Sequence, residues 1–210
     1  MNNLILDCSY GMNVYVVKDD KVFSYEDKTQ NKHSDEILKI IDDLLDESEL
    51  TIKHIDNICV CLGPGSFTGV RVAVSIAKGL AIGSGAKVFA LSNFDVCEKQ
   101  DGDNVLILEG FSNFVYSRIC QNGKLEDSCI EIEKLVEEIK NKNLKVFYTT
   151  EKTQNRLNKF EIFGKTIKNN IIFAFNQEII NGESVDLNQI FPVYLRASQA
   201  EIEREKKKNA

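Results

Sequence analysis

The chain has 210 residues, of which 43% are hydrophobic, so it can bury a core as one large domain or as two small lobes. Its formal net charge is -6, and its only dense basic run, Lys206 to Lys208, lies near the C-terminal end. Proteins that bind the phosphate backbone of nucleic acids carry clustered Lys and Arg, so the composition argues against direct nucleic-acid binding by this chain alone.

The first half of the chain predicts a meander of strands followed by two helices. Strand-like runs with turn signals between them lie at residues 4–7, 13–17 and 21–25. Ser34 is a candidate N-cap, and the apolar stripe from Ile37 to Leu45 predicts an amphipathic helix. The pattern then predicts a buried strand at residues 57–62, a loop at 63–69, a helix from 70 to about 83, and a strand at 87–91.

The same order of elements returns in the second half, from about Asp103. Strands are predicted at residues 105–108, 114–120 and 124–130, a helix at 132–140, and a strand at 144–149. Both halves follow the order βββαβ, which predicts an α/β fold of two duplicated lobes, residues 1–102 and residues 103–210 with a C-terminal tail. Residues 152–170 show no clean period, and no element is predicted there.

The chain shows no sign of secretion or membrane insertion. Its N-terminus has no basic region, its first apolar run is too short for a signal peptide, and no stretch approaches the ~20 apolar residues of a membrane span. We therefore expect a cytoplasmic protein with reduced cysteines. Cys59 and Cys61 are separated by one residue and no CxxC pair occurs, which favours small core side chains over a metal site.

A glycine-rich segment joins a predicted strand to a predicted helix, where backbone amides can bind a phosphate. It consists of Gly63, Pro64, Gly65, Ser66, Phe67, Thr68 and Gly69. A Walker A loop is excluded, because Gly-Lys-Ser/Thr would have to stand where Gly69, Val70 and Arg71 stand. A dinucleotide-binding loop is a weak alternative, because Thr68 replaces its third Gly or Ala. The remaining interpretation is a structural turn that needs glycine for positive φ and close packing.

This segment and its continuation, GPGSFTGVRVAVSIAKGLA from Gly63 to Ala81, resemble the signature of the TsaB family, also called YeaZ. Three further stretches are similar to the family's IDTS, HSE and PxYLR motifs, namely LDCS at residues 6–9, HSD at 33–35 and PVYLR at 192–196. The chain departs from the family's DAR-like triplet and the EVY that follows it, because it has EGF at residues 109–111 and FVY at 114–116.

The resemblance implies two tandem RNase H-like lobes of the actin, sugar kinase and Hsp70 superfold, which agrees with the duplicated βββαβ pattern. It further implies a non-catalytic subunit that binds and activates a related catalytic subunit, TsaD. TsaD transfers threonylcarbamoyl to adenosine in tRNA, with the ATP-binding protein TsaE assisting. The chain alone is expected to form a homodimer and to meet tRNA only through the complex.

The resemblance implies neither a metal nor a cofactor in this chain. Catalytic relatives hold a metal with His-x-x-x-His, and the corresponding stretch here, residues 93–97, has no histidine. Asp7 and Glu109 end the first strands of the two lobes, which keeps open a nucleotide cleft in a free-standing ATP-dependent phosphotransferase or hydrolase. Asp7 alternatively fixes the following turn by accepting backbone hydrogen bonds.

The helix from Val70 is apolar over roughly 200° of its surface, which is wider than one sheet covers. Its small residues permit a neighbouring helix to approach closely. The resemblance favours a partner face, on which this helix and the one from Ile37 join a helix bundle with TsaD; burial inside the lobe is the alternative. The predicted partner-binding side chains are Ile37, Ile41, Val70, Ala73, Val74, Ala77 and Ala81.

Overall fold

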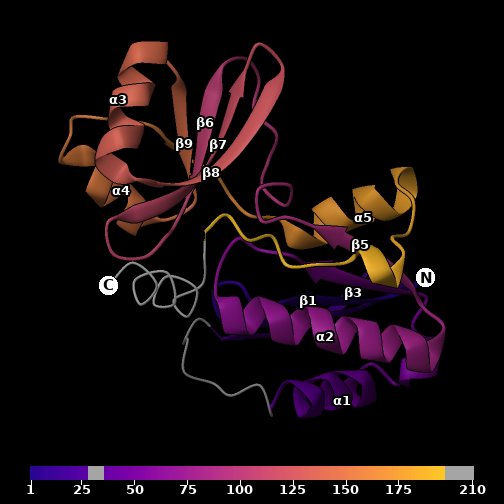
Figure 1. Cartoon of the computed structure of the whole chain (residues 1–210). Coiled ribbons are helices and arrows are strands. Elements are labelled where there is room, and N and C mark those ends of the chain that lie inside the picture. The colour runs from indigo at the N-terminus through magenta and orange to yellow at the C-terminus, as the bar shows by residue number, and fades with distance from the viewer. Residues whose placement is uncertain (28–35, 197–210) are drawn as a thin grey trace, which may run out of the picture. The chain divides into compact units, whose positions relative to one another are not determined.

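The computed structural model describes residues 1–27 and 36–196 (Figure 1). The candidate cap Ser34, the HSD stretch at residues 33–35 and the basic run from Lys206 to Lys208 lie outside the described residues. The chain divides into two compact units. Among the described residues, unit 1 comprises those of Met1–Val96 and Ile171–Val193, and unit 2 comprises Cys97–Asn170 and residues 194–196.

Unit 1 is built on a five-stranded mixed sheet with the order β3-β2-β1-β4-β5. Its strands are β1 (Asn2–Asp7), β2 (Met12–Lys18), β3 (Lys21–Asp27), β4 (Asn57–Cys61) and β5 (Lys87–Leu91). The first three strands pair antiparallel, whereas β4 pairs parallel with both β1 and β5. Parallel neighbours need crossover connections, and helices supply them here.

Helices cover both faces of this sheet. α1 (Ile37–Glu47) and α2 (Phe67–Ser84) lie on one face and α5 (Ile171–Asn181) lies on the other (Figure 1). Successive strand residues point to opposite faces, so Leu4 and Leu6 pack in the core with α1 and α2 while Ile5 packs with Phe175 of α5. Two short 3-10 helices, η1 (Ile52–His54) and η2 (Leu187–Gln189), complete the unit.

Unit 2 repeats this plan with a sheet of order β10-β9-β6-β7-β8. Its strands are β6 (Asn104–Leu108), β7 (Phe114–Gln121), β8 (Lys124–Glu131), β9 (Lys145–Tyr148) and β10 (Lys165–Thr166). The two helices are α3 (Ile132–Lys142) and α4 (Glu151–Asn158). Ile107 of β6, Leu135 of α3 and Leu157 of α4 belong to one buried cluster, so both helices pack on the same core.

The predicted βββαβ order is present in both units, but the predicted boundary between lobes needs correction. The prediction assigned everything after residue 102 to the second lobe, whereas α5 and the segment up to Val193 belong to unit 1. The reason is the apolar face of α5, because Ile171 and Phe175 pack in a cluster with Tyr15 of β2. The unassigned stretch 152–170 contains most of α4 and all of β10.

Candidate functional site

The glycine-rich loop of unit 1 packs directly on the turn that follows β1. The Ser66 amide donates to the Ser9 carbonyl oxygen at 2.9 Å. A Cβ atom at Gly65 would lie 2.6 Å from that same oxygen, and a Cβ at Gly69 would overlap the carbonyl oxygen of Cys8. Glycine is therefore required at both positions because the two backbones approach each other closely, which supports the interpretation as a structural turn.

The same loop starts α2 earlier than the sequence pattern predicts. Ser66 is the N-cap, and its Oγ accepts a hydrogen bond from the Gly69 amide at 3.2 Å. The helix consequently begins at Phe67 rather than at Val70. Because the amides of Ser66 and Gly69 both donate within the chain, two of the groups that would bind a phosphate at this helix start are already used.

Replacing Gly69 with Ala is expected to destabilise the isolated chain by about 1–3 kcal/mol or more, because the new methyl group has no space beside Cys8. Gly79→Ala, in the middle of α2, is the matched control. A Cβ at Gly79 would meet nothing within 4 Å, so this variant should gain up to about 1 kcal/mol from helix propensity. Urea denaturation measures both changes, and equal stability of the two variants would contradict the close packing of loop and turn.

Asp7, the acidic residue at the end of β1, is used to fix the turn after it. Its Oδ1 accepts a hydrogen bond from the Ser9 amide at 2.9 Å. Burial raises the pKa of Asp7, and the hydrogen bonds from Ser9 act in the opposite direction. Burial, together with the neighbouring Asp7 charge, also raises the pKa of the Cys8 thiol to about 12, so Cys8 is not a reactive thiolate. A carboxyl group enclosed in this way is a poor ligand for a hydrated Mg²⁺ ion.

The stretch at residues 93–97 corresponds to the one with metal-binding histidines in the resemblance, and as far as Val96 it is held by hydrogen bonds within unit 1. Asn93 Nδ2 donates to the Pro64 carbonyl oxygen at 2.8 Å, which ties this stretch to the glycine-rich loop. Asp95 Oδ2 accepts from Ser92 Oγ at 2.5 Å. Across residues 1–27 and 36–196, no group of three or more His, Cys, Asp or Glu side chains is arranged to hold a metal ion.

A serine nucleophile with a histidine base is also not assembled in the part of the chain that the structure describes. Ser9 is buried, and Ser66 Oγ caps α2. The described histidine, His54, lies in η1, where its Nδ1 accepts the Thr51 amide at 3.0 Å. Each of these side chains therefore has a local structural role.

The equivalent turn of unit 2, between β6 and β7, is filled by aromatic packing. The Phe111 ring stacks on Phe114 with centroids 5.3 Å apart, and the Arg196 guanidinium lies 3.4 Å from the Phe111 centroid. Glu109 Oε1 accepts from Lys152 Nζ of α4 at 2.5 Å. The departure from the family's DAR-like triplet thus has a structural explanation, because Phe111 packs between Phe114 and Arg196.

The side chains predicted to bind a partner lie inside unit 1 instead, which corrects that prediction. All are at most 5% exposed and belong to the main core cluster: Ile37, Ile41, Val70, Ala73, Val74, Ala77 and Ala81. They occupy the stripe of α1 and α2 that packs on the sheet. A side chain without accessible surface does not contact another protein unless the core opens.

The exposed side of α2 is the surface that a partner can reach. Arg71, Ser75, Gly79 and Gly83 are exposed there, and Ile82 is 75% exposed. Three apolar side chains flank the buried stripe and are only partly buried: Val72, Ile76 and Leu80. On α1, Leu38 is 51% exposed. The sequence pattern distinguishes the wide apolar arc of α2 from the narrower arc that holds Arg71, Ser75 and Gly79. Periodicity alone does not indicate which arc faces the sheet.

α2 is apolar enough that its composition needs an explanation. Its 18 residues have a mean hydropathy of 1.2, which by length and composition alone meets the test for a membrane span, whereas from the sequence alone we expect no stretch to approach one. Five of its side chains belong to the core of unit 1, so part of this apolar character is used inside the protein. Burial in the core does not account for the outer apolar side chain, Ile82.

Sequence comparisons connect this chain to one family. The family model "TsaD: tRNA N6-adenosine threonylcarbamoyltransferase" matches residues 26–204. The chain is 26% identical over 225 residues to a Bacillus subtilis protein named tRNA threonylcarbamoyladenosine biosynthesis protein TsaB, covering 96% of each chain. It is also 26% identical over 196 residues to the Buchnera aphidicola protein of the same name, covering 86% of this chain and 87% of the relative.

Solved structures show the same fold. YeaZ from Pseudomonas aeruginosa superimposes with a TM-score of 0.71 at 21% identity, covering 92% of this chain and 99% of YeaZ. A second Pseudomonas aeruginosa structure, described as similar to peptidase YeaZ, gives a TM-score of 0.73 at 21% identity, covering 93% and 99%. The predicted α/β fold of two lobes is confirmed. Since the family model covers most of its length, the chain belongs to the TsaD family, tRNA N6-adenosine threonylcarbamoyltransferase, and within it to the TsaB (YeaZ) group of its curated relatives.

Proposed function

We propose that this chain is a non-catalytic subunit in the biosynthesis of tRNA threonylcarbamoyladenosine, which binds and activates a TsaD-type catalytic subunit with a TsaE-type ATPase assisting. Relatives aligned over most of the chain are named as biosynthesis proteins of this pathway. The observation that carries the non-catalytic role is that the positions for phosphate and metal are filled by the chain's own contacts, as at Asp7, Asn93 and Phe111. The proposal implies a cytoplasmic protein.

The exposed side of α2, together with the exposed Leu38 of α1, is our proposed partner-binding face. Glycine inside a helix costs about 1 kcal/mol relative to Ala, and nothing in unit 1 requires Gly79 or Gly83, because a Cβ at either would meet nothing within 4 Å. Both glycines leave space for a partner helix to approach closely. Ile82 supplies exposed apolar surface on the same helix. In the absence of TsaD, a second copy of this chain would use the same face.

Complex formation tests the proposal. We expect the chain to form a stable complex when it is mixed with the TsaD-type protein of its own organism, as measured by analytical ultracentrifugation. We also expect the complex with TsaE, but not TsaD alone, to modify tRNA efficiently. Two proteins that sediment separately at tens of micromolar would contradict the scaffolding role.

The isolated chain is expected not to bind Mg-ATP measurably. The amides of Ser66 and Gly69 donate within the chain, and the loop carries no lysine of the kind that contacts nucleotide phosphates. Isothermal titration calorimetry measures this directly. A dissociation constant in the low micromolar range would instead favour the free-standing ATP-dependent enzyme.

A further inference from the structure

Unit 2 carries a concentration of positive charge that the acidic composition of the whole chain conceals. Residues 152–170 contain five basic residues and one acidic residue, whereas the chain as a whole has a net charge of -6. The basic residues are Lys152, Arg156, Lys159, Lys165 and Lys168. All of them lie on α4, on the loop that follows it, or on and after β10. The local field at this surface is therefore opposite in sign to the net charge of the protein.

Three of these cations converge on one hollow. Lys152, Arg156 and Lys159 follow the spacing i, i+4, i+7, which places them on one face of α4 and its C-terminal end. Together with Glu151 and Asn155 they line an open hollow of about 460 Å³. Three of its five lining side chains are cations against one carboxylate, Glu151, so the charge of the lining is positive. Its chemistry suits an anion.

Two of the cations are held in place by Glu109, just after β6, and by Phe114, the first residue of β7. Lys152 Nζ donates to Glu109 Oε1 at 2.5 Å, and Arg156 Nη1 donates to the Phe114 carbonyl oxygen at 3.2 Å. Arg156 Nη2 has no hydrogen-bond partner among the described residues. This nitrogen is buried, so Arg156 contributes its positive charge, held in place through Nη1, rather than a free donor to the hollow.

We propose that this face of α4, formed by Lys152, Arg156 and Lys159, binds backbone phosphates of RNA. An open hollow with a positively charged lining accepts a phosphodiester backbone that passes over it. Lys152 is already paired with Glu109, so this face neutralises about two phosphates, which gives weak, salt-dependent binding with a log–log salt slope of roughly -1 to -2. This face is therefore an auxiliary contact, and the choice of tRNA as the RNA rests on the proposed function.

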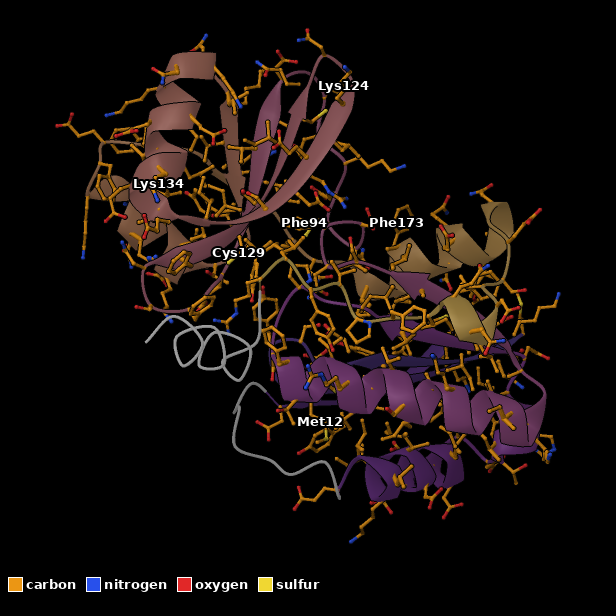
Figure 2. The ribbon with its side chains drawn as sticks, viewed as in Figure 1. Met12, Phe94, Lys124, Cys129, Lys134 and Phe173 are labelled. Carbon is orange, nitrogen blue, oxygen red and sulfur yellow. The ribbon has the colours of Figure 1, made fainter. Side chains whose placement is uncertain are left out.

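Fluorescence anisotropy of labelled tRNA with the full chain, from about 50 mM salt upward, tests the proposal. Lys159→Glu should weaken binding about fivefold or more and lower the salt slope by about 1. Lys124→Glu makes the same charge change at the tip of the β7–β8 hairpin, at the other end of the sheet order from β10, and should stay within about twofold of wild type (Figure 2). Equal weakening by both variants, or no binding by the wild type at low salt, would overturn the proposal.

Two further experiments are needed. One distinguishes an RNA backbone from free phosphate as the ligand, and the other distinguishes the RNA-binding proposal from the scaffolding proposal. Inorganic phosphate added at the same total phosphate concentration as the tRNA should not displace it, and full displacement would show a site for free phosphate rather than for an RNA backbone. Lys159→Glu should still form a complex with the TsaD-type protein, because Lys159 is not on α1 or α2. If Lys159→Glu lost both tRNA binding and complex formation with the TsaD-type protein, the RNA proposal would fail. If wild type formed no complex, only the scaffolding role would fail.

Discussion

Ala77→Glu is expected to unfold unit 1. Ala77 has no accessible surface and lies in the core cluster with the side chains of β1, β4 and α1. A carboxylate forced into this core costs several kcal/mol, and its extra volume costs roughly 1–3 kcal/mol more. Since a domain is stable by only about 5–15 kcal/mol in total, the variant should lose most of its folding free energy. Circular dichroism should show a melting temperature at least about 10 °C lower, or no cooperative transition.

Ser75→Glu is the matched control for this variant. Ser75 lies two residues earlier on α2 and is exposed, so the same new side chain should leave the melting temperature within about 2 °C of wild type. A folded Ala77→Glu protein of normal stability would restore the original expectation, that this stripe of α2 faces a partner. Comparing the two variants therefore decides whether the Ala77 side of α2 packs in the core of unit 1 or faces a partner.

Local patterns were sufficient to predict most of the architecture. Strands such as β1 and β2 have continuous apolar runs and turn signals between them, and α1 has a clear apolar stripe, so the βββαβ order could be predicted twice. α4 could not be predicted in the same way, because only Thr153 and Leu157 of its eight residues are buried and two positions do not make a period. The packing of α5 on the sheet of unit 1 is a long-range contact that no local period indicates.

The candidate site shows the same division between local and long-range information. The glycine-rich loop could be predicted as a turn, because Gly63, Gly65 and Gly69 are close in sequence. Its contact with Ser9 could not, since the two segments are more than 50 residues apart and meet only through the pairing of β1 and β4. For α2, the width of the apolar arc could be predicted, but whether Ala77 or Gly79 faces outward depends on where the sheet lies.

The basic face of α4 was missed for a related reason. Lys152, Arg156 and Lys159 are separated by three and two residues in the sequence, so they do not form a dense basic run. They become neighbours only once the stretch is helical, and no helix was predicted there. A search for basic residues at i, i+4, i+7 spacing would have found this face without a structure.

Gly79→Glu is expected to abolish binding to the TsaD-type partner while leaving the chain folded. The new side chain points away from unit 1, because a Cβ at this position meets nothing within 4 Å, and Glu is a better helix former than Gly. The melting temperature should therefore be equal to or above that of wild type. At a close helix–helix contact, however, an unpaired carboxylate costs several kcal/mol, and each 1.4 kcal/mol weakens the affinity about tenfold.

Gln177→Glu on α5 is the control for this last variant. It adds the same single negative charge to unit 1 at an exposed position, but on the opposite face of the sheet from α2. Analytical ultracentrifugation with the TsaD-type protein should show wild-type association for Gln177→Glu and a loss of at least about 100-fold for Gly79→Glu. Normal association of a folded Gly79→Glu protein would mean that the partner binds elsewhere, and that the glycines of α2 serve a purpose other than helix packing.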